Sequence, residues 1–154
     1  MSFLTERDWV TKAGLRAVCL LVNNGSHRCG YVEVPEGHPL DGVDDSTAHP
    51  SLVFAGDEEI GKRGLIPLIR HAVSENHDAV SPGAFFNVHG GITFSGRSDE
   101  NNEYPARGGR WWFGFDCAHL NDRTAYRPCG VFRSQEYVEA ECESLASQLV
   151  GVAQ

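Results

Sequence analysis

The 154-residue sequence has few basic residues and no long apolar run, and each of these absences excludes a class of protein. Its 13 lysines and arginines stand against 21 acidic residues, for a net charge of −8. This balance argues against unspecific binding to the phosphate backbone of nucleic acids. No apolar stretch approaches the ~20 residues of a membrane span, and the first residues carry Glu6 and Asp8 where a signal peptide has an apolar core. We therefore expect neither a nucleic-acid polymer nor a membrane as partner.

Cysteine is present in an odd number and without any C-x-x-C pair. Five cysteines in this arrangement argue against a disulfide framework and against a cysteine-rich zinc site. Reduced thiols in a cytoplasm fit the pattern better. One bridge stays open, between Cys19 and Cys29, because they flank a predicted hairpin.

What the sequence does contain predicts an α+β fold in a single domain, residues 1–154. Asn24-Gly25, between the apolar run 15–22 and the strand 28–34, is the strongest short-range hairpin signal. Ser134 is placed to cap a helix over 135–150, whose apolar residues recur at helical spacing. We expect a mostly antiparallel sheet with this C-terminal helix packed on one face.

The remaining elements follow from weaker signals. Capping residues predict a short helix over 6–13, and Pro67 favours another within 65–73. Aromatic and β-branched residues predict strands over 85–94, interrupted by two glycines, and over 111–115. Residues 43–83 read as a loop-rich central insertion lying over the site.

Two stretches of the chain combine an apolar approach with polar residues, FFNVHGGITFSG (85–96) and WWFGFDCAHLND (111–122). We expect them to face one another and to form the functional centre. Four residues are the predicted catalytic groups: His89, Asp116, His119 and Asp122. Imidazole and carboxylate together bind a divalent metal or share acid–base work, and the sequence leaves both open. The structural alternative is that Asp116 caps a turn and His119 is a satisfied histidine.

A second group of residues has the character of ligand contacts. Gly90 and Gly91 allow close backbone approach and an anion nest, and the Thr93 hydroxyl adds a donor. His38 would complete a three-histidine site, and Trp112 would stack on a base or ring. The structural alternatives are a β-bulge, a rigid exposed loop and a core tryptophan. Cys117, two residues before His119, also invites a thiolate-nucleophile hypothesis.

These segments resemble a family of small bacteriophage proteins. The shared motifs are GYV-x-VP-x-x-HP-x-x-G at 30–42, HGG-x-T-[FY] at 89–94, WW-x-GFD-x-AH-x-x-D at 111–122 and EYV-x-x-E at 136–141. The resemblance covers most of the chain outside residues 43–83. It implies a phage accessory protein made in the cytoplasm of a bacterial host, and it brings no reaction and no residue role with it.

Two functions fit the predicted centre. The first is a hydrolase or phosphodiesterase-like enzyme acting on a nucleotide-type molecule, such as a host signalling nucleotide, with or without a divalent metal. In it, His119 is a base or ligand oriented by Asp116 or Asp122, and His89 is the second acid, base or ligand. The second is a non-catalytic counter-defence protein that sequesters such a nucleotide. A host-protein-interaction domain is the third alternative, and an exposed edge of the 15–34 hairpin would favour a homo-oligomer.

Overall fold

The hairpin predicted at Asn24-Gly25 forms the centre of the sheet. In the computed structural model, which describes residues 2–54, 79–99 and 101–152, β2 (Arg16–Val22) pairs antiparallel with β3 (His27–Val34). Asn23, Asn24 and Gly25 have φ of 52°, 59° and 88° between the two strands. Asparagine and glycine tolerate this left-handed region better than other residues, which lets the chain reverse over four residues.

Three more strands extend the hairpin into one antiparallel sheet. They are β1 (Phe3–Val10), β4 (Phe94–Arg97) and β5 (Trp111–Asp116), and the strand order is β1-β2-β3-β5-β4. Both outer edges of the β2–β3 hairpin are covered, because β1 pairs with β2 and β5 pairs with β3. The hairpin therefore offers no free edge of its own, and the predicted homo-oligomer loses that support.

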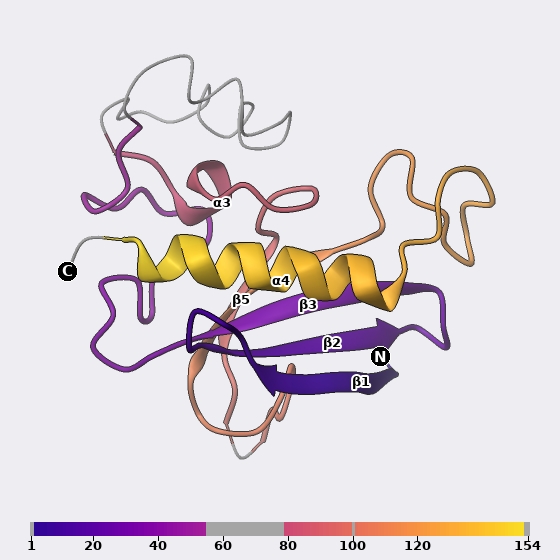
Figure 1. Ribbon diagram of the computed structural model, residues 1–154, viewed down its shortest axis with the longest axis horizontal. Helices are drawn as coiled ribbons and strands as arrows, with labels where there is room; N and C mark the ends of the chain where they lie inside the picture. The colour runs from indigo at the N-terminus through magenta and orange to yellow at the C-terminus, as the bar shows by residue number, and fades with distance from the viewer. Residues whose placement is uncertain (1, 55–78, 100, 153–154) are drawn as a thin grey trace.

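The long helix α4 (Gln135–Val150) crosses one face of this sheet, which confirms the predicted α+β class (Figure 1). The Ser134 hydroxyl accepts from the Tyr137 N–H and caps the helix as expected. One stripe of α4 is buried against β2 and β3, and its members are Val138, Cys142, Leu145, Ala146 and Leu149. None of the helices in the described ranges is long and apolar enough to cross a membrane.

A second, smaller core lies on the opposite face of the sheet. Its buried residues are Val18, Leu20, Val22, Cys29, Tyr31 and Trp112. Tyr104 and Ala106, from the connection between β4 and β5, pack over it. Because strand residues alternate between faces, Cys19 belongs to the α4-side core while Cys29 belongs to this one. Both thiols are free, and the bridge left open between them is absent.

Two glycine–aromatic pairs hold β3 and β5 in register. Gly30 is opposite Phe115, and Tyr31 is opposite Gly114. A Cβ at Gly30 would lie 2.4 Å from the Phe115 ring, and a Cβ at Gly114 would lie 2.3 Å from the Tyr31 ring. Each aromatic ring therefore lies directly over the glycine of the other strand.

The predicted helix over 6–13 is wrong, because those residues belong to β1 and the turn after it. The capping pattern at Thr5 is a local signal, and strand pairing with β2 overrides it. Contacts with α4 also favour the strand, since Trp9 Nε1 donates to Glu143 Oε1 at 3.1 Å and Arg7 pairs with Glu139. The pairing with β2 shifts between Thr5 and Arg7, which marks a bulge at Glu6.

The predicted strand over 85–94 is also wrong for most of its length. Ser81 caps a one-turn helix, α3 (Pro82–Phe85), and a loop then leads to β4. Gly90 and Gly91 have φ of 68° and 79°, which breaks a strand. The apolar side chains Phe86, Val88 and Ile92 still reach the α4-side core. Within the predicted insertion, Leu52 and Val80 join the same core, whereas the helix expected within 65–73 lies outside the described residues.

Candidate functional site

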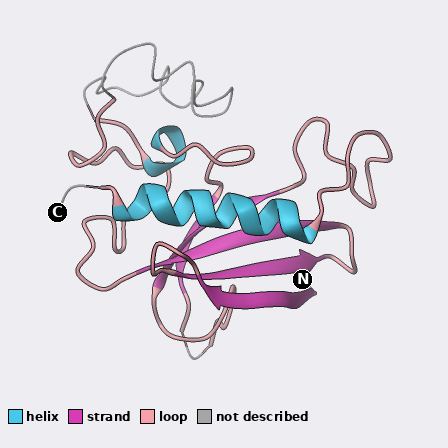
Figure 2. Ribbon diagram, in the orientation of Figure 1, coloured by secondary structure: helices cyan, strands magenta, loops and turns pink. Residues whose placement is uncertain are grey.

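Asp122 is a fully buried carboxylate in the loop between β5 and α4. Figure 2 shows this segment as loop throughout. Asp122 Oδ1 accepts from Arg133 Nε at 2.8 Å, and Oδ2 accepts from His89 Nε2 at 2.7 Å and from the His119 backbone N–H at 3.0 Å. Burial raises the pKa of Asp122, but these hydrogen bonds outweigh it and hold the pKa below its usual value. Asp122 is therefore an ionised group that ties the two predicted stretches together.

His89 is held at both of its ring nitrogens. Its Nε2–H donates to Asp122, and in the neutral ring Nδ1 then accepts from the Tyr137 hydroxyl at 2.7 Å. Tyr137 comes from the first turn of α4, and the Arg133 guanidinium lies 5.1 Å from the centre of its ring. Hydroxyl, imidazole and carboxylate thus form one hydrogen-bonded chain.

His119 lies beside this chain and pairs with the other carboxylate. Its Nε2 lies 3.3 Å from Asp116 Oδ1, the i,i+3 pairing that the sequence predicts. That nitrogen is buried and makes no hydrogen bond to the described residues. The His119 ring centre is 6.1 Å from that of His89, and a Cβ at Gly90 would lie 2.3 Å from its Nε2. The four predicted catalytic residues and Gly90 are therefore brought together.

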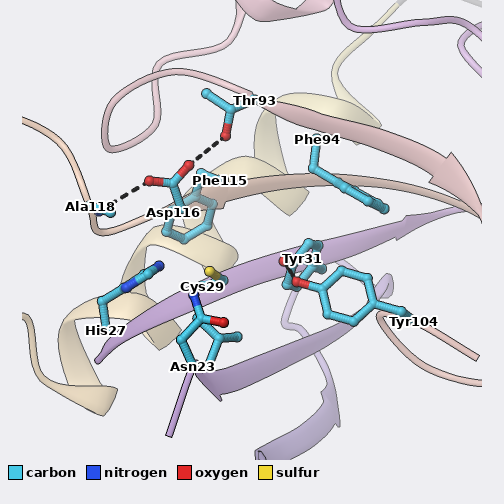
Figure 3. Close-up of a pocket in the computed structure, with 11 residues that line it drawn as sticks. Asn23, His27, Cys29, Tyr31, Thr93, Phe94, Tyr104, Phe115, Asp116 and Ala118 are labelled. Carbon is cyan, nitrogen blue, oxygen red and sulfur yellow. Dashed lines mark hydrogen bonds between the residues drawn. The ribbon is translucent and has the colours of Figure 1, made fainter. Parts of the chain in front are cut away.

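Asp116 also lines a cavity of ≈ 370 Å³ on the sheet face away from α4 (Figure 3). Its Oδ2 accepts from the Thr93 hydroxyl at 2.9 Å and its Oδ1 from the Ala118 N–H at 3.1 Å. Figure 3 shows Asp116, Thr93 and His27 at one end of the cavity and the rings of Tyr31, Phe94 and Tyr104 at the other. The predicted ligand contact at Thr93 thus lies in the cavity wall.

Burial sets the protonation of the other polar groups in this cavity. Desolvation lowers the pKa of His27, although the charges of Asp116 and Asp122 oppose it, so the ring is neutral at pH 7. Burial raises the pKa of Cys29 to about 12, with a contribution from Asp116. His27 and Cys29 are therefore uncharged polar groups of the cavity wall.

Two of the predicted ligand contacts are occupied by interactions within the fold. Trp112 is fully buried in the second core and donates from Nε1 to Ser98 Oγ at 3.3 Å, so the prediction of a stacking surface there is wrong. The Gly91 N–H donates to the Val88 carbonyl at 2.8 Å and is used in a turn, so it is not a free donor for an anion nest.

His38 does not join the other two histidines, and the predicted three-histidine site is wrong. Its Nε2–H donates to the Leu149 carbonyl at 2.8 Å, and its Nδ1 accepts from the Leu40 N–H at 3.0 Å. Leu149 is twelve residues along α4 from Tyr137, a rise of about 18 Å. His38 instead fastens the loop after β3 to the end of the helix.

Replacing His38 with alanine should destabilise the fold without affecting the candidate site. The buried Leu40 N–H would lose its acceptor, a cost of about 1–3 kcal/mol for an unsatisfied buried group, while the Leu149 carbonyl would keep its bond from the Val152 N–H. Denaturant unfolding measures this loss. An unchanged unfolding midpoint would contradict the structural role of His38, and a changed NMR signal of the His89 ring would contradict the separation of His38 from the candidate site.

Cys117 does not have the surroundings of a nucleophile. Burial raises the pKa of its thiol and the charge of Asp122 raises it further, so the thiolate is not populated at neutral pH. The Cys117 hypothesis is therefore not supported. Across 2–54, 79–99 and 101–152, no three His, Cys, Asp or Glu side chains gather as the ligands of a metal ion would.

Three residues of the site were missed by reasoning from the sequence: His27, Arg133 and Tyr137. Tyr137 was assigned only to the apolar stripe of α4, although it lies in the first turn beside the capping Ser134. His27 begins β3 and shares the cavity with Asp116, to which no sequence spacing relates it.

No family model, curated protein or solved structure matches this chain in comparisons with known proteins.

Proposed function

We propose that the chain binds a nucleotide-type small molecule in the Asp116 cavity and hydrolyses it as a phosphodiesterase-like enzyme. The observation that carries the proposal is the position of Asp116, whose carboxylate lines the cavity and lies 3.3 Å from the buried Nε2 of His119. A host signalling nucleotide as the substrate of a phage accessory protein remains part of the proposal, and the phage origin rests on the family resemblance alone.

The cavity has the size and walls that suit a nucleobase. Its volume of ≈ 370 Å³ is in the range of small-molecule sites. The Tyr31 and Phe94 rings meet edge to face at 5.2 Å between centres, and Phe94 and Tyr104 at 5.6 Å. Such rings provide flat apolar surface for a base, and the Asp116 carboxylate accepts from its amino or imino groups.

Acid–base chemistry would use the pairing of Asp116 with His119. An imidazole next to a carboxylate takes a proton more readily, because the negative charge stabilises the imidazolium that forms. The second pair, His89 and Asp122, lies next to the first, because the Asp122 carboxylate also accepts from the His119 backbone N–H. The His89 ring centre lies 6.1 Å from that of His119, but both His89 nitrogens are already hydrogen-bonded, so His119 is the imidazole that the proposed cleavage uses.

Capture without turnover is the second candidate, and one observation favours it. Asp116 already accepts from Thr93 and Ala118, which fixes its carboxylate as a hydrogen-bond acceptor. A fixed acceptor suits recognition of a base, whereas a general base must exchange its proton during the reaction.

Mass spectrometry with a panel of linear, cyclic and ADP-ribose-type nucleotides separates the two candidates. The protein is analysed native and after heat denaturation, with and without a chelator. We expect conversion of at least one nucleotide in the wild type, and a loss of about 10²–10⁴-fold in rate in His119→Ala. Asp116→Asn should abolish both binding and conversion. Glu136→Gln, on the exposed start of α4, is the control and should behave as wild type.

The outcomes are distinct. A nucleotide that is held and released unchanged on heating would establish capture and remove the catalytic roles. Conversion that survives His119→Ala would overturn the role of that imidazole. A protein that neither binds nor alters any nucleotide of the panel would overturn the proposed function, and a protein partner would then be the better search.

A further inference from the structure

The hydrogen-bonded chain of Tyr137, His89 and Asp122 has an order that the proposed function does not use. Both nitrogens of His89 are occupied, one by Asp122 Oδ2 and the other by Tyr137 Oη, each at 2.7 Å. His89 therefore has no free ring nitrogen with which to bind a ligand. The group that His89 is placed to act on is the Tyr137 hydroxyl.

We propose that Tyr137 is a nucleophile, activated by His89 and Asp122, that accepts a phosphoryl group from an activated phosphate ester. Hydroxyl, imidazole and buried carboxylate stand in the same order as in the Ser-His-Asp arrangement. That arrangement is recognised by geometry and roles, and Tyr137 occupies the place of the serine. Asp122 holds His89 in the tautomer whose Nδ1 faces the hydroxyl.

The resting state of Tyr137 fits this role. Burial raises the pKa of the phenol, and Glu141 adds to this, while Arg133 opposes both. The hydroxyl therefore keeps its proton at neutral pH and donates it to His89. The Arg133 guanidinium lies 5.1 Å from the ring centre, and its positive charge favours the negative charge that develops on the phenol as the proton leaves.

The transfer balances without any further reactant. The Tyr137 oxygen attacks phosphorus as its proton passes to His89 Nδ1, and the new P–O bond forms. The bond from phosphorus to the leaving group breaks, and the leaving group departs with the electron pair and takes the proton from His89. Asp122 stays ionised and stabilises the intermediate imidazolium.

Diisopropyl fluorophosphate tests this proposal without a nucleotide, so its result does not depend on the proposed function. The reagent loses fluoride and leaves one diisopropylphosphoryl group on a reactive hydroxyl. Peptide mass spectrometry then locates the group. We expect it on Tyr137 at least tenfold faster than on Tyr126, which is highly exposed at 85% and serves as an internal reference.

Two variants and one control sharpen the test. Tyr137→Phe removes only the hydroxyl and should abolish labelling at position 137. His89→Gln removes the base and should slow the labelling of Tyr137 by about 10²–10⁴-fold. Tyr126→Phe is the matched control and should leave the rate at Tyr137 unchanged. Circular dichroism and thermal unfolding show whether each variant is folded.

Labelling of Tyr137 no faster than that of Tyr126 in the wild-type protein would overturn the proposal, whatever the variants show. An unchanged Tyr137 rate in a folded His89→Gln protein would equally overturn it, since the reactivity would then belong to an ordinary phenol. A nucleotide panel without binding or turnover, together with fast labelling of Tyr137, would leave this inference standing and overturn only the proposed function.

Discussion

Replacement of Asp122 by alanine should lower the free energy of unfolding by about 3–5 kcal/mol, the cost of removing one partner from a buried ion pair. Asp122 is 0% exposed, and its loss would leave Arg133 Nε, His89 Nε2 and the His119 N–H without their shared acceptor. Denaturant unfolding followed by circular dichroism measures the change.

The pH dependence of the same variant gives a second readout with a defined sign. The pKa of Asp122 is lowered in the folded protein, so its stabilising contribution is present above the ordinary aspartate pKa of ~3.9 and is lost as the pH falls through the folded value. The difference between wild type and variant should therefore be constant near neutral pH and shrink below about pH 4.

A surface ion pair offers the control for Asp122. Arg110 and Glu36 lie 2.7 Å apart in an exposed position, so Glu36→Ala should change stability far less than Asp122→Ala. Equal effects of the two substitutions would show that Asp122 does not organise the loop between β5 and α4.

Gly90→Ala should be the second most damaging change, with an expected loss of about 2–5 kcal/mol. Its φ of 68° costs an L side chain about 1–2 kcal/mol, and overpacking adds about 1–3 kcal/mol. The new methyl group would lie 2.3 Å from Nε2 and Cδ2 of His119, so that ring must move. Movement of the ring should also disturb its approach to Asp116.

Gly14→Ala separates the two contributions. Gly14 has φ of 93°, but a Cβ there would have nothing within 4 Å, so only the backbone cost of about 1–2 kcal/mol applies. Thermal unfolding of both variants gives the comparison. Equal losses would contradict the close packing of His119 on Gly90, and an unchanged His119 ring signal in the NMR spectrum of Gly90→Ala would do so directly.

Signals that are local in the sequence predicted the elements they govern. Asn24-Gly25 predicted the hairpin, and Ser134 predicted the start of α4 at the residue where it begins. The same kind of signal failed at Thr5, where a helix-capping pattern lies in a strand. Pairing with β2 and contacts to α4 are distant in sequence, and nothing near Thr5 records them.

The residues of the site were likewise predicted where their signal is local in the sequence, and missed where it is not. His89, Asp116, His119 and Asp122 were found because they gather in two short stretches, and the structure brings those stretches together. The pairing within them was less predictable: the Asp122 side chain binds the His119 backbone N–H and the side chain of His89. Tyr137 was hidden because an amphipathic helix explains an aromatic residue without any chemistry. His38 was misplaced because a histidine in a Pro/Gly-rich loop looks exposed, whereas here it is buried.

The two glycine–aromatic pairs between β3 and β5 have a consequence for how the site tolerates change. A slip of one residue between β3 and β5 would put Tyr31 opposite Phe115, or would put the rings opposite residues that carry side chains. Every side chain of β5 would also change face. Asp116 would then leave the cavity for the α4 side. The alignment of Asp116 with His27 and Thr93 thus depends on Gly30 and Gly114, which do not line the cavity. Substitutions there would behave as site mutations in any assay, although they act through strand alignment.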